Sequence, residues 1–118
     1  MAVTVEQTIA TLSERFARVR AAQQARAAAV RERVGRMVAE RLQPDTRAWL
    51  IGSLAWGGFG PRSDVDIVLH GATPEQACRL EVHLTRELRL SVDVLRLEDL
   101  PASFRERVVQ QGVRLNGD

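Results

Sequence analysis

A short apolar run with two carboxylates built into it constrains the fold of this chain more than any other feature. Asp64 and Asp66 flank Val65, and an apolar stretch follows from Ile67. On a β-strand, residues two apart point to the same side, so the two aspartates project together while Val65 and Ile67 turn into a core. Two neighbouring carboxylates repel each other unless a cation lies between them. The stretch therefore predicts a strand that carries a cation-binding pair of carboxylates.

A Gly-Ser pair precedes this strand by a short distance. Ten residues separate Gly52-Ser53 from Asp64. A tight turn here offers backbone N–H groups and a hydroxyl to phosphate oxygens, and a helix starting near Ser53 adds its positive end. Oxygen ligands suit Mg²⁺, which binds one or two carboxylates and fills its shell with water and substrate phosphates. The combination predicts a site for a metal-bound nucleotide.

A third aspartate lies in a second apolar strand. In Val92-Asp93-Val94 the two valines face one side and Asp93 the other. Burying a charge alone is costly, so we expect Asp93 to have a partner. If this strand lies beside the first, three carboxylates gather on one face, as in two-metal phosphoryl or nucleotidyl transfer. For Asp64 and Asp66 taken alone, a solvated strand face is the alternative.

The remaining pattern predicts a small mixed β-sheet with packed helices, an α/β (α+β) fold. Helices and strands are expected in the order helix, strand, strand, helix, strand, helix. After the N-terminal helix these are the strand Arg47–Ile51, the loop Gly57–Pro61, the strand Asp64–Leu69, the helix Pro74–Leu88, the strand Ser91–Leu95 and the helix Ala102–Gln111. Trp49 is expected in the core, and Cys78 is expected to be a small buried side chain.

The N-terminal third predicts an unusually long helix. Thr4 and Gln7 form a capping box, and apolar residues then recur at helical spacing as far as Leu42. One helix from Val5 to Arg41 would be roughly 55 Å long, more than a domain of this size can cover. Either it breaks near Ala22–Ala28 and folds back, or its N-terminal half reaches a partner. We expect residues 1–30 to be a helical extension and residues 31–118 to be the domain.

Composition narrows the class of protein. The chain has 118 residues, 45% of them hydrophobic, and a net charge of +2, which fits one globular domain. All 17 basic residues are arginines, but no aromatic residues alternate with them, so direct nucleic-acid binding is not expected. A single cysteine, the absence of an apolar leader and the absence of a membrane-length segment predict a cytoplasmic protein with no membrane association.

These motifs together resemble the minimal nucleotidyltransferases of the DNA polymerase β superfamily. The resemblance rests on Gly52-Ser53-Leu54-Ala55-Trp56-Gly57, Ser63-Asp64-Val65-Asp66-Ile67 and Val92-Asp93-Val94, and extends from about Arg31 to Leu115. It implies a small mixed sheet with helices packed on it, a polymerase-β-like nucleotidyltransferase core.

The resemblance also implies roles for individual residues. Gly52 and Ser53 would hold the triphosphate of ATP, the donor substrate. Asp64, Asp66 and Asp93 would be the catalytic residues and would bind two Mg²⁺ ions, and Asp93 would also help to deprotonate the acceptor hydroxyl. Related proteins carry a basic residue where this chain has Trp56, which can stack on a base or pack under the loop but cannot neutralise a phosphate. Arg62 is near enough in sequence to supply the missing charge.

Minimal nucleotidyltransferases of this size resemble antitoxins of two-gene modules whose partner is a HEPN-type ribonuclease toxin. The implied reaction is transfer of AMP from ATP to a tyrosine hydroxyl of that toxin, within a hetero-oligomer. Two other interpretations stay open. The protein neutralises its partner by complex formation alone, with a weakened site, or it modifies a small hydroxylated molecule such as an aminoglycoside. Retention of three carboxylates disfavours the first, and the lack of a second domain disfavours the second.

Overall fold

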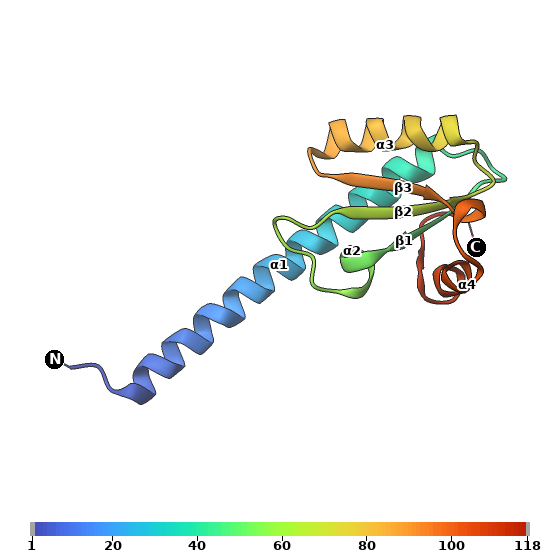
Figure 1. Ribbon diagram of the computed structural model, residues 1–118. Helices are drawn as coiled ribbons and strands as arrows, with labels where there is room; N and C mark the ends of the chain where they lie inside the picture. The colour runs from blue at the N-terminus through green and yellow to red at the C-terminus, as the bar shows by residue number, and fades with distance from the viewer. Residues whose placement is uncertain (1, 118) are drawn as a thin grey trace.

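The computed structural model describes residues 2–117 and contains one four-stranded sheet with helices on both faces (Figure 1). Its elements follow the predicted order with small shifts at the ends. They are α1 (Val5–Arg41), β1 (Arg47–Ile51), α2 (Gly52–Trp56), β2 (Val65–His70), α3 (Pro74–Leu88), β3 (Val92–Arg96), the 3₁₀ turn η1 (Leu97–Asp99), α4 (Ala102–Gln111) and β4 (Val113–Arg114). The predicted small mixed sheet with packed helices is confirmed.

The sheet has the strand order β3-β2-β1-β4. Strand β1 runs antiparallel to both β2 and β4, whereas β2 and β3 are parallel. A parallel pair needs a crossover connection, which α3 supplies. Because β2 lies between β1 and β3, its side chains have neighbours on both sides.

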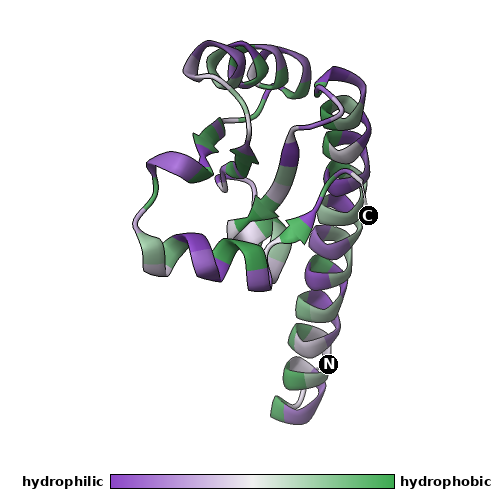
Figure 2. Ribbon diagram, turned by 90° about the vertical axis from the view of Figure 1, so that its right-hand side faces the viewer, coloured by the Kyte–Doolittle hydropathy of each residue, from purple (hydrophilic) through white to green (hydrophobic). Residues whose placement is uncertain are grey.

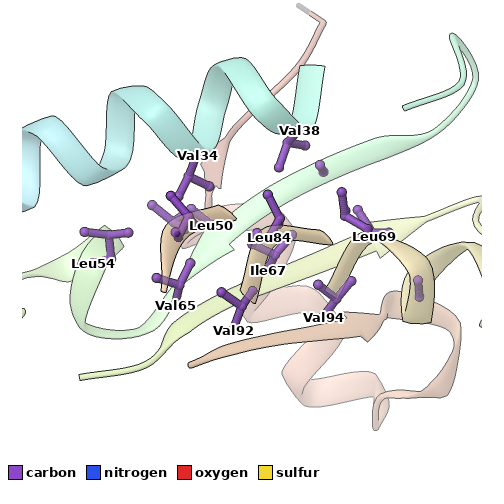
Figure 3. Packing of buried hydrophobic residues seen from close by; sticks show 14 of the residues in the cluster. Val34, Val38, Leu50, Leu54, Val65, Ile67, Leu69, Leu84, Val92 and Val94 are labelled. Atoms are coloured by element: carbon purple, nitrogen blue, oxygen red, sulfur yellow. The ribbon is translucent and has the colours of Figure 1, made fainter. Parts of the chain in front are cut away.

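The two faces of the sheet bury different side chains. Alternate residues of β2, namely Val65, Ile67 and Leu69, pack with α1 and α3 in the larger core cluster (Figure 3). Val68 points to the other face, where Val108 of α4 belongs to the same smaller cluster. Trp49 is buried in that smaller cluster, as predicted. The alternation follows from the two-residue period of a strand.

Helix α1 is continuous, so the predicted alternative of a break near Ala22–Ala28 is wrong. It begins with the predicted capping box between Thr4 and Gln7 and runs for 37 residues. Its C-terminal half packs on the sheet through Val34 and Val38, whereas its N-terminal half extends away from the globular part (Figure 1). The chain therefore measures 66 × 31 × 23 Å.

Side chains occupy backbone groups of β3 and of the part of β1 that β4 does not pair with. At the β3 edge, the backbone N–H of Val94 donates to the Glu81 carboxylate of α3 at 2.9 Å. Beyond the two-residue β4, the Asn116 side chain accepts from the N–H of Ala48 at 2.8 Å and donates to the carbonyl of Thr46 at 2.6 Å. Asn116 thus satisfies the backbone of β1 where no strand covers it.

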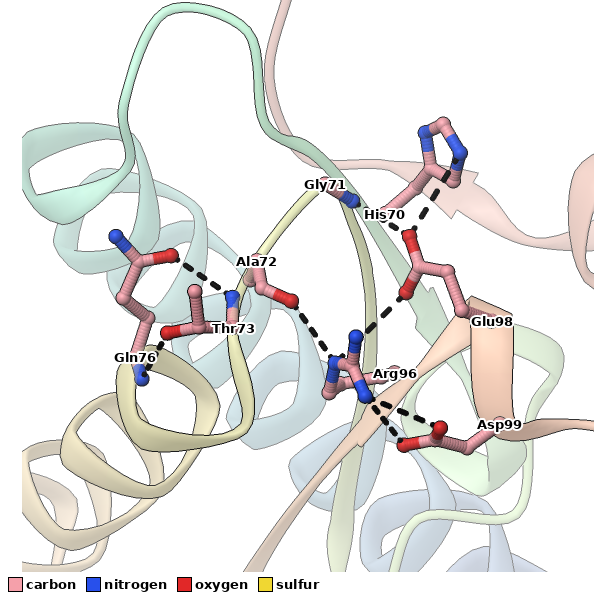
Figure 4. A network of polar contacts seen from close by, with 8 residues as sticks. All are labelled: His70, Gly71, Ala72, Thr73, Gln76, Arg96, Glu98 and Asp99. Atoms are coloured by element: carbon pink, nitrogen blue, oxygen red, sulfur yellow. Dashed lines mark hydrogen bonds and ion pairs between the residues drawn. The ribbon is translucent and has the colours of Figure 1, made fainter.

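A polar network joins the ends of β2 and β3 that lie away from the aspartates (Figure 4). Arg96 donates to both carboxylate oxygens of Asp99 at 3.1 Å and also lies 3.9 Å from Glu98. Glu98 accepts from the N–H of Gly71 at 2.7 Å and lies 3.7 Å from His70. Each carboxylate here has a cationic or N–H partner.

One prediction about a side chain is wrong. Cys78 is exposed on α3 rather than buried, because it lies one residue beyond the inward-facing Ala77. Among the described residues, no helix is apolar enough over a sufficient length to cross a membrane.

Candidate active site

The structure brings Asp66 and Asp93 together on neighbouring strands. The two residues are direct partners in the parallel pairing of β2 with β3. Both lie between residues of the larger core cluster, so both side chains project from the opposite face, the one that α4 partly covers. The predicted juxtaposition of these two strands is therefore present. Asp64 lies two residues before Asp66, just ahead of β2.

The three carboxylates influence one another electrostatically. The pKa of Asp66 is raised, first by burial and then by the negative charges of Asp93 and Asp64, with a side-chain hydrogen bond to Asp93 adding to the effect. Repulsion of this kind is what a bound cation would relieve. Their oxygen donors are of the type that suits Mg²⁺.

The carboxylates do not form a closed metal-binding cluster by themselves. Within residues 2–117, no three His, Cys, Asp or Glu side chains are close enough together to hold a metal ion ready-made. Like charges repel, so three aspartates do not close on one another unaided. The assignment of Asp64, Asp66 and Asp93 as metal ligands thus stays a prediction, which the donor chemistry and the raised pKa of Asp66 support.

Asp93 differs from the expectation in one respect. It is exposed, whereas the alternation of β3 buries Val92 and Val94. Its charge is therefore solvated rather than held in a core, and its presence in the strand needs no buried partner. What singles it out is its register with Asp66, which spacing within one strand does not reveal.

Gly52 is fixed by its close approach to Asp66. Its φ of +74° is a conformation that favours glycine, and a Cβ at this position would lie 2.5 Å from Oδ2 of Asp66. The register explains the contact, because Ile51, the residue before Gly52, pairs with Asp66 across β1 and β2. The first residue of the Gly-Ser pair therefore lies directly against the carboxylate site.

Ser53 borders a cavity of about 320 Å³ between α1 and α2. The lining of this cavity includes Gly57, Gly58 and two arginines of α1, Arg20 and Arg31. A helix starts at Gly52, as predicted, but α2 has only five residues. A helix this short has free N–H groups at its start but no long helix dipole. Another cavity of about 260 Å³, lined in part by Thr46 and Leu69, does not include these residues.

The glycine-rich loop after α2 is anchored to α1. Phe59 is buried in the larger core cluster, and the Arg26 guanidinium lies 5.3 Å from the centre of its ring. Arg26 also donates to the carbonyl of Gly60 at 3.4 Å. Within the loop, the Ser63 hydroxyl accepts from the N–H of Gly60 at 2.9 Å.

Trp56 connects α2 to α4. Its indole Nε1–H donates to the carbonyl of Gln111 at 2.9 Å, and the Arg107 guanidinium lies 5.2 Å from the centre of the indole ring. The ring thus contacts α4, while 43% of the residue stays exposed, and the suggested stacking on a base stays a prediction. Arg107 is a cation beside Trp56 that sequence reasoning missed, because 50 residues separate the two and no motif links them.

Arg62 is the cation that the sequence singled out. It lies in the loop before β2, is exposed, and makes no ion pair with the residues that the structure describes. Its guanidinium is therefore not committed to a carboxylate of this chain.

Comparisons with known proteins agree with this geometry. The sequence model of the family described as Polymerase beta, Nucleotidyltransferase matches residues 38–117. No curated protein matches the sequence.

Several solved structures share the fold. A toxin–antitoxin complex with AMP-PNP contains a chain with a TM-score of 0.63 and 23% identity, which covers 75% of this chain and 73% of its own length. A complex of tri-AMPylated Shewanella oneidensis HEPN toxin with MNT antitoxin gives a TM-score of 0.56 and 22% identity, covering 75% and 73%. A candidate minimal nucleotidyltransferase gives 0.56 and 28%, covering 73% and 89%.

Proposed function

Because the chain belongs to the polymerase β nucleotidyltransferase family, we propose that it transfers AMP from ATP to a hydroxyl of a HEPN-type partner protein and so acts as an antitoxin. The observation that carries the proposal is the register of Asp66 with Asp93 beside Gly52. The acceptor that we propose is a tyrosine hydroxyl, and the location is cytoplasmic. Toxin–antitoxin complexes among the structural neighbours support the choice of partner.

Each site residue has a defined part in this proposal. The N–H groups at the start of α2, together with the Ser53 hydroxyl, bind oxygens of the triphosphate. Asp64, Asp66 and Asp93 hold two magnesium ions, which would stabilise the charge that develops on the phosphates. Asp93 is solvated and so is accessible to accept the proton of the acceptor hydroxyl.

The reaction conserves atoms and charge in a simple way. The deprotonated acceptor oxygen forms a bond to the α-phosphorus of ATP, and the bond from that phosphorus to the oxygen bridging the β-phosphate breaks. Pyrophosphate leaves, and the acceptor carries AMP. Rigid strands β2 and β3 hold the carboxylates in register, so the chain contributes positioning rather than a covalent intermediate.

A binding-only antitoxin is the second candidate. Trp56, which replaces the basic residue of related sequences and packs against α4, favours it, because the site then lacks one phosphate-neutralising charge. In that case the protein would neutralise its partner through contact alone.

The test uses ATP labelled at the α-phosphate, Mg²⁺, this protein and the HEPN-type product of the neighbouring gene. We expect label on the partner, loss of that label with the double variant Asp64→Asn/Asp66→Asn, and retention with Asp99→Asn, which changes a carboxylate at the other end of the sheet. A partner that binds wild-type protein without acquiring label would support the binding-only alternative.

A further inference from the structure

The N-terminal half of α1 carries an apolar stripe that nothing in the chain covers. The spacing between consecutive members of this stripe alternates between four and three residues, as in a coiled coil. They are Val5, Ile9, Leu12, Phe16 and Val19, and between 43% and 75% of each residue is exposed. We call these five residues the N-terminal stripe. Exposure of so many large apolar side chains in one row marks an interaction surface.

The N-terminal stripe lies on the same face of α1 as the residues that pack on the sheet. Ile9, Phe16, Val30 and Met37 fall at multiples of seven residues from one another. Val30 and Met37 pack against the core. A seven-residue repeat stays on nearly one face of a helix, drifting by about 20° per repeat. The globular part thus covers the C-terminal half of this face, Gln23 interrupts its apolar residues, and apolar patches continue along α1 toward the N-terminus (Figure 2).

We propose that the N-terminal stripe pairs with the same stripe of a second copy of this chain, as an antiparallel two-helix coiled coil centred near Glu14. The length of the uncovered segment of α1 determines this arrangement. The uncovered segment runs from the capped start at Val5 to Gln23, roughly 28 Å, and Arg26 is the point where the loop contacts begin. A helix of the same length fits this gap.

Sterics exclude the parallel alternative. In each copy the globular part occupies the stripe side of α1 from about Ala27 onward. Two parallel helices with facing stripes would place each globular part in the volume of the other helix. In the antiparallel arrangement each globular part lies beyond Thr4 of the other copy, where that helix has ended.

The antiparallel register pairs four of the five stripe residues with one another. Ile9 faces Val19 of the second copy and Leu12 faces Phe16, while Val5 faces Gln23. A register shifted by one heptad toward the sheet would place Val5 against Val30, which the core already occupies. A shift the other way would place Val19 against Ala2, which precedes the start of the helix, and would shorten the helical overlap.

Charges flanking the stripe fit the same register. Glu6 lies opposite Arg20 of the second copy, and the two-fold symmetry makes this pair twice. Neither residue forms an ion pair within the described part of the chain. Parallel pairing would instead set Arg15 against Arg20, a like-charge contact. In the antiparallel arrangement Arg15 faces Arg15 of the second copy across the two-fold axis. This one repulsive contact partly offsets the two favourable Glu6–Arg20 contacts.

The pairing would reach the cavity that Ser53 borders. Thr4 of the second copy lies opposite Gln24, which lines the same cavity as Ser53. Self-association would therefore bring the start of one helix to the border of that cavity in the other copy.

The test is the molar mass of the full chain across a concentration series, by light scattering and sedimentation, without nucleotide or partner. We expect a dimer of the 13.1 kDa chain. Leu12→Glu should give a monomer with unchanged helix content, whereas Ala21→Glu, on the opposite face of the same helix, should leave the dimer. A wild-type chain that stays monomeric at every concentration overturns the proposal.

A charge exchange tests the register. Glu6→Arg and Arg20→Glu should each weaken the dimer at least fivefold, and the double exchange should restore it. Spin labels on cysteines at Gln7 or Ser13, in a Cys78→Ser background, test the orientation. Antiparallel helices place the two Ser13 positions about 3 Å apart along the axis and the two Gln7 positions about 21 Å apart. Equally short separations at both positions would show parallel pairing and overturn the proposal. Because no catalysis is measured, these outcomes do not depend on the proposed function.

Discussion

The two ends of the β2–β3 pair place carboxylates in opposite surroundings. At one end, burial and the charges of Asp93 and Asp64 raise the pKa of Asp66. At the other, burial acts to raise the pKa of Glu98, but the N–H of Gly71 and the nearby His70 and Arg96 outweigh it and lower that pKa. The far end is a completed structural network, whereas the aspartate end has oxygen ligands in excess of cations. The same chemical group is structural at one end and available for a ligand at the other.

The largest effect is expected at the junction of Gly52 with Asp66. Gly52→Ala would place a Cβ against Oδ2 of Asp66 and force alanine into a left-handed conformation. We expect a loss of about 1–3 kcal/mol in the free energy of unfolding, together with loss of ATP binding. Urea denaturation and calorimetric titration measure the two quantities.

Gly35→Ala is the matched control for that substitution. No atom lies within 4 Å of the added Cβ at this helical position. Alanine should therefore stabilise the chain by about 0.5–1 kcal/mol and leave ATP binding intact. Equal effects of the two substitutions would show that Gly52 has no special contact with the site.

The next largest effect is expected for the basic residue that replaces the phosphate-neutralising charge missing at Trp56. If Arg62 replaces it, Arg62→Ala should lower ATP affinity about tenfold, since a charge-assisted hydrogen bond contributes roughly 1.5–3 kcal/mol. Arg107→Ala should lower it less than threefold, because Arg107 already lies against Trp56. Titration of each variant with ATP and Mg²⁺ decides between them. The reverse order of effects would transfer the role to Arg107.

A smaller effect is expected for Asp66→Asn on the thermal stability of the ligand-free protein. Asp66→Asn removes a charge that Asp93 and Asp64 repel, so the melting temperature without Mg²⁺ should rise by about 1–2 °C. Any increase in melting temperature that Mg²⁺ and ATP produce in the wild type should disappear. A variant that melts lower than the wild type would contradict the view that these carboxylates repel one another.

The smallest effect is expected at the far end of the pair. Because the folded-state pKa of Glu98 is lowered, its ionised form stabilises the fold above its unfolded pKa, and this contribution is lost as the pH falls through the folded value. Glu98→Gln should therefore reduce stability at neutral pH by a few tenths of a kcal/mol, since Glu98 is partly exposed. The difference from wild type should vanish in acid. Denaturation curves at pH 7 and pH 3 provide the comparison, and a difference that grows in acid would refute it.

Much of the fold is predictable because the relevant signals are local. The capping box at Thr4, the proline that opens α3 and the alternation in β2 and β3 each involve a few neighbouring residues. Continuity of α1 was not decided by its sequence, because the alanine-rich stretch is compatible with both alternatives. Its structure shows one helix whose two apolar segments lie on the same face, with Gln23 between them.

The site was predictable only in part, for the same physical reason. The spacing of Gly52-Ser53 and Asp64-Asp66 is a local pattern, but the pairing of Asp66 with Asp93 depends on which strands are neighbours. Similarly, the contact of Arg107 with Trp56 joins α4 to α2 and has no counterpart in local spacing. The burial expected of Cys78 failed because a one-residue step rotates a helical side chain away from the inward face that Ala77 occupies.

The side chains that bind backbone groups of β3 and β1 also bear on how copies of this chain can associate. An open edge strand can accept a strand from another molecule, which leads to extended assemblies. Here Glu81 occupies the N–H of Val94 on one edge, and Asn116 occupies backbone groups of Ala48 and Thr46 at the other. Strand addition at those positions would have to displace hydrogen bonds that already exist. At those positions, association through the exposed part of α1 displaces no hydrogen bond of this kind, whereas strand addition does.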